Sequence, residues 1–311
     1  MRRGDGCAAA SPQLSLRTDT LLAVRLGNAV EHRVDVGTSE VRVVTAGVGT
    51  PAVLFDSALG TPLEAGSLVV PAVAARTRVI LWDRPGIGGS GPSVALDAEG
   101  MAVAMAAVAR SVGETSVIAV GHSRGGIHVL ALAACHPELV AGLVLVESSH
   151  PDQLNRMPDG DGPLLRAVRL LAEVPRPLAQ VPAYAVRLLV RARGDRARLG
   201  ARAMADLAPA MSARLDGFVA EYDAGPAILA DTAQAVADRG ISDVPLIVLT
   251  GDQNYSDPAA QSMWDGMHEE LALLSARGQH VPIACGHEMP FSNPDAVIDA
   301  INDLLDQASR A

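Results

Sequence analysis

The chain has 311 residues, of which 49% are hydrophobic, and its formal net charge is −10 at pH 7. This length allows a large buried core, and no apolar run reaches the ~20 residues that a membrane-spanning helix needs. The acidic balance argues against nucleic-acid binding, which usually requires a basic surface. All 25 basic residues are Arg, and a chain without Lys cannot form a Schiff base or a Ser/Lys catalytic pair.

The N-terminal residues and the cysteines are typical of a soluble cytoplasmic protein. Arg2 and Arg3 are not followed by the apolar segment of a secretory signal, and residues 1–30 are expected to form a loose arm. Three cysteines are present without the spacing of a metal site: Cys7, Cys135 and Cys285. Neither a disulfide framework nor stable membrane insertion is predicted, and the oligomeric state is left open.

Short apolar runs rich in β-branched residues predict five strands in the first half of the chain. Their ranges are 32–36, 41–45, 52–55, 77–82 and 116–120. The first two are joined by a short turn and should form one end of a sheet. The fifth is apolar almost throughout, so it should be buried on both faces. A helix is predicted over 96–112, just before this fifth strand.

The hexapeptide Gly121-His122-Ser123-Arg124-Gly125-Gly126 follows the fifth strand, and residues 127–136 predict a helix directly behind it. The motif G-x-S-x-G therefore occupies a strand-to-helix turn. In such a turn Ser123 adopts a strained backbone conformation, and the glycines let the neighbouring chain pass close by. The Ser123 hydroxyl should project above the carboxyl edge of the sheet, which predicts a nucleophile elbow.

Beyond the elbow helix, a buried strand at 142–146 ends in Glu147. Open α/β sheets place their chemistry at the carboxyl ends of their strands, so this carboxylate is a candidate catalytic acid. The strand pattern then stops, and helical periodicity extends over 152–239. This stretch is predicted to be a helical insertion.

The last part of the chain resumes the sheet pattern. Strands are predicted at 245–250 and 280–284, with a helix at 259–276 between them. His287 follows the last strand directly, and Asn293 should cap a final helix at 295–305. Among the histidines of the sequence, only His287 lies in the loop after the last predicted strand, in the chain order nucleophile, acid, histidine.

In this combination of motifs the chain resembles the α/β-hydrolase family from about residue 34 to residue 305. The resemblance implies an α/β fold of the α/β-hydrolase type, with a mostly parallel central sheet flanked by helices and a helical lid insertion. The implied organisation is an N-terminal arm at 1–30, a first core part at 31–151, the lid at 152–239 and a second core part at 240–311.

The resemblance also implies roles for particular residues. His287 stands where the family has its catalytic histidine, and the backbone N–H groups of Leu59 and Arg124 stand where it forms the oxyanion hole. The family usually places its acid three residues after the Gly of the loop at 251–258, and Asn254 occupies that position. Asparagine cannot carry the charge that stabilises an imidazolium.

A charged triad acid would therefore have to come from another position. Some branches of the family, including many haloalkane dehalogenases, carry it one strand earlier, and Glu147 resembles that placement. Glu147 is the favoured acid and Asp252 the alternative. Asp257, or no acid at all, remains a further possibility.

A serine at the elbow argues against haloalkane dehalogenase and epoxide hydrolase activity, because enzymes of those branches need a carboxylate nucleophile. The predicted function is a carboxylesterase-like serine hydrolase, which cleaves a carboxylic ester or related acyl bond of a small molecule through an acyl-enzyme intermediate. Lactone, thioester, amide and C–C bonds are open alternatives, and no cofactor or metal is expected. The competing hypothesis is a non-catalytic ligand-binding or scaffolding protein of the same fold, because the acid is missing from its usual position.

Overall fold

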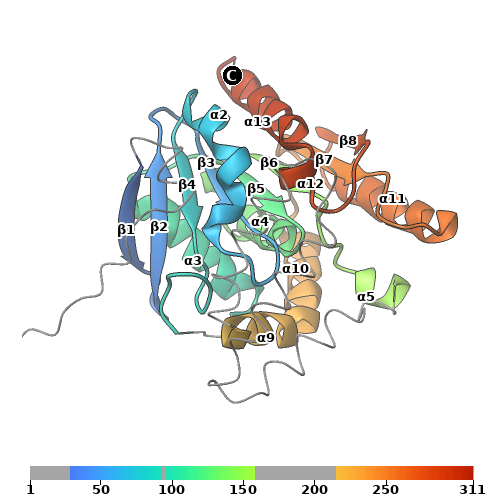
Figure 1. Ribbon diagram of the computed structural model, residues 1–311, viewed down its shortest axis with the longest axis horizontal. Coiled ribbons are helices and arrows are strands. Elements are labelled where there is room, and N and C mark those ends of the chain that lie inside the picture. Colours follow the sequence, from blue (N-terminus) through green and yellow to red (C-terminus); the bar gives the residue numbers. More distant parts are fainter. Residues whose placement is uncertain (1–28, 93–95, 158–214, 311) are drawn as a thin grey trace, which may run out of the picture.

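The computed structural model describes residues 29–92, 96–157 and 215–310 (Figure 1). Nearly all of the predicted N-terminal arm and the larger part of the predicted lid lie outside the described residues. Eight strands form one sheet in the order β1-β2-β4-β3-β5-β6-β7-β8. In Figure 1 the sheet runs from β1 at one side of the molecule to β7 and β8 at the other.

The strands are β1 Val30–Asp35, β2 Glu40–Ala46, β3 Ala52–Asp56, β4 Val79–Trp82, β5 Val117–His122, β6 Val140–Val146, β7 Leu246–Gly251 and β8 Gly278–Ile283. Strand β2 pairs antiparallel with both β1 and β4, and all other pairs are parallel. Each predicted strand is present, with ends within two residues of those expected. The mostly parallel α/β sheet predicted from the sequence is confirmed.

The helical elements are η1 Leu63–Leu68, α2 Val70–Ala74, α3 Ala98–Ser111, α4 Arg124–Cys135, η2 Pro137–Leu139, α5 Gln153–Arg156, α9 Leu215–Asp223, α10 Gly225–Arg239, α11 Pro258–Ala272, α12 Met289–Ser292 and α13 Pro294–Ala308. Local side chains define where several of them begin. Asp97 accepts a hydrogen bond from the Gly100 N–H at the start of α3, and Asn293 accepts one from the Ala296 N–H at the start of α13. The predicted Asn293 cap is therefore present.

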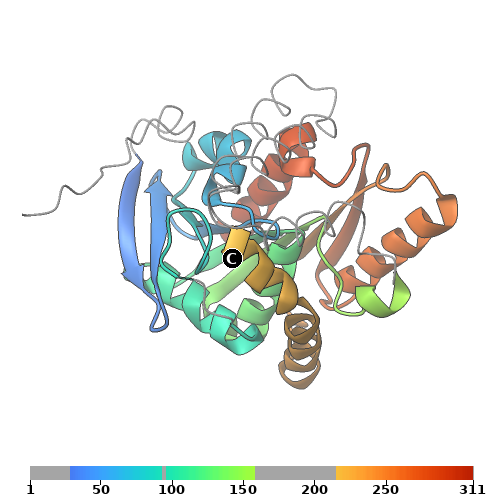
Figure 2. The same ribbon diagram turned by 60° about the horizontal axis from the view of Figure 1, so that its bottom comes forward.

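The central strands bury both of their faces, in two separate apolar layers. Successive residues of a strand point to opposite faces, so along β5 Val117 and Ala119 contribute to one layer, and Ile118 and Val120 to the other. Helices α3, α4, α10 and α11 cover the first face, and α2, α12 and α13 cover the second (Figure 2). This two-sided burial explains why the strands read as nearly continuous apolar runs in the sequence.

Helix α10, at the end of the predicted insertion, belongs to the first of these layers. It packs against α3 and α4, and its residue Ile228 is buried in the core. The described end of the insertion therefore packs into the hydrophobic core. The division of the chain into domains stays a prediction. Among the described residues, no helix combines the length and the apolar character needed to cross a bilayer.

The register of the strands places the loops after β3, β5 and β6 at one edge of the sheet. Asp56 of β3 lies beside Gly121 of β5, and His122 of β5 lies beside Val146 of β6. The chain segments that follow β3, β5 and β6 therefore leave the sheet next to one another. This edge carries the candidate site.

Candidate active site

Ser123 occupies a strained turn between β5 and α4. Its backbone has φ 54° and ψ −117°, a conformation with positive φ that non-glycine residues rarely adopt. A Cβ at Gly125 would lie 2.3 Å from the Asp56 carbonyl oxygen, and one at Gly121 would lie 2.4 Å from the Gly125 carbonyl oxygen. Neither position can hold a side chain. The motif therefore forms the tight strand-to-helix turn expected from the sequence.

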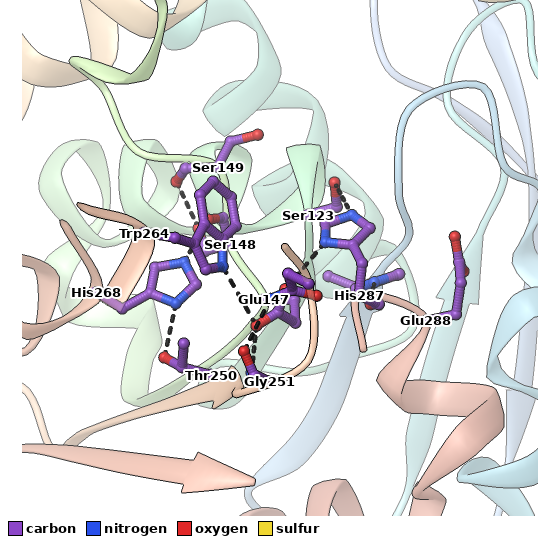
Figure 3. Close-up of polar contacts among 12 residues, drawn as sticks. Ser123, Glu147, Ser148, Ser149, Thr250, Gly251, Trp264, His268, His287 and Glu288 are labelled. Atoms are coloured by element: carbon purple, nitrogen blue, oxygen red, sulfur yellow. Dashed lines mark hydrogen bonds and ion pairs between the residues drawn. The ribbon is translucent and has the colours of Figure 1, made fainter. Parts of the chain in front are cut away.

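His287, in the loop after β8, bridges the serine and a carboxylate. Its Nε2 lies 3.0 Å from the Ser123 Oγ, and its Nδ1 lies 3.0 Å from Oε2 of Glu147 (Figure 3). A carboxylate can only accept a hydrogen bond, so Nδ1 of His287 carries the proton that it donates to Glu147. Nε2 is then unprotonated and can accept the serine proton. Residues that are 24 and 164 positions apart from Ser123 thus form one continuous hydrogen-bonded chain.

His122 supports this histidine from the side. Its Nε2 donates to the His287 carbonyl oxygen at 2.9 Å, and the two rings have centroids 5.3 Å apart. Burial lowers the pKa of His122, which favours the neutral ring. His122 therefore packs against His287 and holds its backbone.

Glu147 is fully buried at the carboxyl end of β6, with an unusual positive φ of 48°. Its carboxylate accepts four hydrogen bonds. Oε1 receives the Gly251 N–H and the Trp264 indole N–H at 3.4 Å, and Oε2 receives His287 and the Asn254 amide, the latter at 2.8 Å. Burial alone would raise the pKa of Glu147, but the bond to His287 and the charge of its ring outweigh this, and the pKa is lowered.

The other candidate acids lie apart from this chain. Asp252 is exposed, and among the described residues its carboxylate makes no hydrogen bond to His287. Asp257 caps α11 by accepting from the Ala259 N–H at 3.1 Å. Asn254, at the usual position of the family's acid, donates to Glu147 instead of replacing it. The geometry brings Ser123, His287 and Glu147 together.

Three residues near Glu147 are not among the site residues predicted from the sequence: Trp264, His268 and Thr250. His268 donates from Nε2 to the Ser148 carbonyl oxygen at 2.8 Å, and its Nδ1 lies 2.6 Å from the Thr250 hydroxyl. Burial lowers the pKa of His268 to about 4, so its ring is neutral. Trp264 and His268 are four residues apart on α11 and therefore share one helix face. That spacing is the one signal in the sequence, because their partners, directly after β6 and on β7, are distant in the chain.

The expected oxyanion donors belong to the segments that follow two neighbouring strands, β3 and β5. Leu59 belongs to the loop after β3, and Arg124 is the first residue of α4, whose N–H has no partner within the helix. Neither N–H donates to another group in the described part of the chain. The Arg124 side chain runs toward α10, where Nη1 donates to the Gly225 carbonyl oxygen at 3.2 Å, and burial lowers its pKa.

The described ranges contain no group of three or more His, Cys, Asp or Glu side chains arranged to hold a metal ion. The chemistry that the site can perform with its own residues is proton transfer and nucleophilic attack. A serine hydroxyl, an imidazole and a buried carboxylate in this order can activate the hydroxyl at neutral pH.

Comparison with protein families shows to which family the chain belongs. The family described as "Alpha/beta hydrolase family" matches residues 46–300. The chain belongs to the alpha/beta hydrolase family. This membership confirms the resemblance seen in the sequence and supports hydrolase activity. No curated protein matches the chain.

Solved structures share the fold of this alpha/beta hydrolase at low sequence identity. An enol-lactonase from Burkholderia xenovorans LB400 aligns with a TM-score of 0.67 at 20% identity, covering 88% of this chain and 100% of its own. A thermophilic esterase from Thermogutta terrifontis aligns at 0.66 and 20%, covering 89% and 98%. The epoxide hydrolase CorEH aligns at 0.64 and 20%, covering 90% and 99%. At such identities the similarity establishes the fold.

Proposed function

We propose that this alpha/beta hydrolase is a serine hydrolase that cleaves a carboxylic ester of a small molecule through an acyl-enzyme intermediate. The observation that carries the proposal is the pair of 3.0 Å hydrogen bonds that joins Ser123 to His287 and His287 to Glu147. Each residue then has a defined role: Ser123 is the nucleophile, His287 the general base and acid, and Glu147 the acid that orients and stabilises the imidazolium.

Acylation begins when Ser123 Oγ attacks the ester carbonyl carbon while its proton passes to His287 Nε2. The tetrahedral intermediate carries an oxyanion, which the Leu59 and Arg124 N–H groups stabilise. His287 then returns the proton to the alkoxy oxygen, the carbon–oxygen bond breaks, and the alcohol leaves. The buried negative charge of Glu147 stabilises the protonated ring during both transfers.

Deacylation repeats the sequence with water as the nucleophile. His287 Nε2 takes a proton from water as its oxygen attacks the acyl carbon, and the same N–H groups stabilise the second oxyanion. Collapse of this intermediate breaks the bond to Ser123 Oγ, which regains its proton from His287. The products are a carboxylic acid and an enzyme restored to its starting state.

The choice of an ester follows from the nucleophile and from the neighbours. A serine forms a hydrolysable ester with an acyl group, whereas the epoxide hydrolase and haloalkane dehalogenase branches use a carboxylate as nucleophile. Two of the similar structures bear the names of an esterase and an enol-lactonase, which both denote cleavage of a carboxylic ester bond. These names support an ester or lactone substrate for this chain.

A fluorophosphonate probe together with p-nitrophenyl ester hydrolysis tests the proposal. The parent protein should be labelled and should hydrolyse the ester, and Ser123→Ala should lose both properties while keeping its melting temperature. Ser256→Ala, at an exposed position in the loop after β7, is the matched control and should behave as the parent. A folded parent protein that shows neither labelling nor hydrolysis of any ester, lactone or thioester would instead favour the non-catalytic binding protein.

A further inference from the structure

The Arg84 guanidinium, in the loop after β4, is buried and uses all five of its N–H groups. Nη1 donates to Asp56 Oδ1 at 3.0 Å and to the Ser57 carbonyl oxygen at 2.9 Å. Nη2 donates to the Ala58 carbonyl oxygen at 2.8 Å and to Glu221 Oε2 at 3.0 Å, and Nε donates to Glu221 Oε1 at 2.5 Å. Only Arg offers five donors in this fixed arrangement. The two carboxylates outweigh the cost of burial, so the pKa of Arg84 is raised and the group stays charged.

Two of these bonds fix peptide groups of the loop after β3. The Ala58 carbonyl and the Leu59 N–H belong to one peptide group, and in a trans peptide these two point in opposite directions. When Arg84 and the Thr61 N–H hold the Ala58 carbonyl oxygen, the Leu59 N–H must point away from the guanidinium. Arg84 therefore determines where the expected oxyanion donor points.

Helix α9, which follows residues 158–214 in the chain, also contacts the loop after β3. The Glu221 Oε2 that receives Arg84 also accepts the Gly60 N–H at 2.7 Å. Phe218 lies so close that a Cβ at Gly60 would be 2.1 Å from its Cδ2. Gly217, one helical turn from Glu221, lies so close to the loop after β4 that a Cβ there would be 2.0 Å from the Gly86 carbonyl oxygen. Helix α9 is thus in close contact with both loops.

We infer that Glu221 is a positioning residue. Through its hydrogen bonds to Arg84 and to the Gly60 N–H, it makes the orientation of the Leu59 N–H depend on the position of α9. Without its carboxylate, two guanidinium N–H groups and the Gly60 N–H lose their acceptor, and an unsatisfied buried donor costs free energy that the loop can recover only by rearranging. The oxyanion donor is then held less well, while the serine, the histidine and the acid keep their own contacts. This role presupposes the function proposed for Ser123.

The variant Glu221→Gln tests the inference, because it keeps the side-chain volume and removes the charge. Loss of one oxyanion donor costs about 10²–10³-fold in kcat, and a misdirected donor should cost about 10- to 100-fold with KM nearly unchanged. Affinity for a trifluoromethyl ketone, which forms a tetrahedral adduct with Ser123, should fall by the same factor. Affinity for the corresponding methyl ketone, an analogue of the ground state, should stay within about threefold. Asp231→Asn, exposed on α10, is the matched control and should match the parent throughout.

Amide hydrogen exchange tests the hold on the loop without any turnover. Exchange at the Gly60 amide, which donates to Glu221, and at the Thr61 amide, which donates to the Ala58 carbonyl oxygen, should be at least about tenfold faster in Glu221→Gln than in the parent, with exchange along β5 unchanged. A second variant, Gly217→Ala, forces α9 away from Gly86 without touching the carboxylate and should give the same combination of faster exchange and lower kcat.

The outcomes separate this role from the proposed function. A folded Glu221→Gln protein whose loop amides exchange at the parent rate overturns the positioning role, whether or not the parent hydrolyses esters. Equal losses of affinity for the two ketones also overturn it, because they indicate a damaged pocket and not a misdirected donor. A parent protein without Ser123-dependent hydrolysis, but with faster loop exchange in the variant, contradicts the proposed function and leaves the coupling of α9 to the loop supported.

Discussion

Glu147 illustrates how single residues are constrained at this site. Its positive φ is costly for a residue with a Cβ. The four donors around its carboxylate come from the end of β7, from the loop that follows it, from α11 and from His287. These donors fix the side chain from three directions, so the strained backbone is retained. The result is a buried carboxylate with a lowered pKa, which is charged when the imidazolium forms.

Replacing Glu147 by Gln should therefore lower kcat by at least about 100-fold, since the acid of a Ser-His-Asp triad contributes about 10⁴-fold in the serine-protease precedent. Gln keeps the shape of the side chain, so the loss reports its charge. Asp252→Asn and Asp257→Asn are the matched controls, and each should stay within about tenfold of the parent. An inactive Asp252→Asn beside an active Glu147→Gln would transfer the role to the later loop.

Asn254→Asp tests the surroundings of the acid. The new carboxylate would face Oε2 of Glu147, which now receives the amide at 2.8 Å, and a like charge raises the pKa of a neighbouring carboxylate. The added negative charge also favours the protonated form of His287, which cannot act as the general base, so the acid limb of the kcat/KM profile should move upward by about one pH unit. Asn254→Ala removes the donor without adding charge and should shift the limb less. Superimposable profiles for the parent and Asn254→Asp would contradict this electrostatic role.

At this scale the sequence allows part of the site to be predicted. Ser123 is marked by glycines that the turn requires, and His287 by its place after the last strand. Glu147 could be favoured because Asn254, at the usual position, cannot be charged. The contacts of Trp264 and Glu221 could not be predicted, because each partner is more than 100 residues away in the chain and only the folded sheet and helices bring them together.

Among the elements, α11 and β7 form the support beneath the acid. His268 of α11 bonds at once to the Ser148 carbonyl oxygen, next to Glu147, and to Thr250 of β7, whose hydroxyl also lies 2.9 Å from His280 Nε2. The carbonyl oxygen only accepts, so His268 donates from Nε2 and accepts at Nδ1 from the Thr250 hydroxyl. This arrangement requires a neutral His268 ring, in agreement with its lowered pKa.

The stability of the protein should therefore fall in acid in a way that depends on His268. Below about pH 6.5 the unfolded chain protonates this histidine, whereas the folded protein does so only near its pKa of about 4. Unfolding then takes up a proton, so this contribution to stability is complete above about pH 6.5 and is lost as the pH falls toward 4. Between pH 7 and pH 5 the loss should be about 2 kcal/mol.

Urea unfolding of the parent and of His268→Gln at the two pH values measures this contribution. The variant should be less stable at pH 7 and should lose about 2 kcal/mol less than the parent between pH 7 and pH 5. Equal losses in the parent and in His268→Gln would show that His268 is not the group responsible.

The elements themselves were predicted unevenly, for physical reasons. Strands buried on both faces give continuous apolar runs, and all eight were found. The short helices η1 and α2 were not, because a stretch of 5 or 6 residues is too short to show helical periodicity. Helix α10 was assigned to the insertion from its periodicity alone, but its apolar face packs on α3 and α4. Periodicity identifies a helix and not the surface it covers.

At the scale of the whole molecule, the site depends on a core that it does not itself form. Helix α4 begins directly after Ser123 and packs against the sheet and against helices α3 and α10. Its residue Leu130 is fully buried in the layer on that face. The turn that holds the nucleophile therefore stays in place only while this layer is packed.

Leu130→Ala should lower the free energy of unfolding by about 2–5 kcal/mol, because it removes buried apolar volume and leaves a cavity that the surrounding helices cannot fill completely. Leu273→Ala makes the same chemical change at a side chain that is 82% exposed, and it should stay within about 0.5 kcal/mol of the parent. Denaturant titration of both proteins measures the difference. Since Leu130 lies about two helical turns from Ser123, folded Leu130→Ala should retain kcat within about fivefold. A loss of kcat as large as that of Glu147→Gln, in protein that is still folded, would mean that packing around α4 sets the position of Ser123 more tightly than its own turn does.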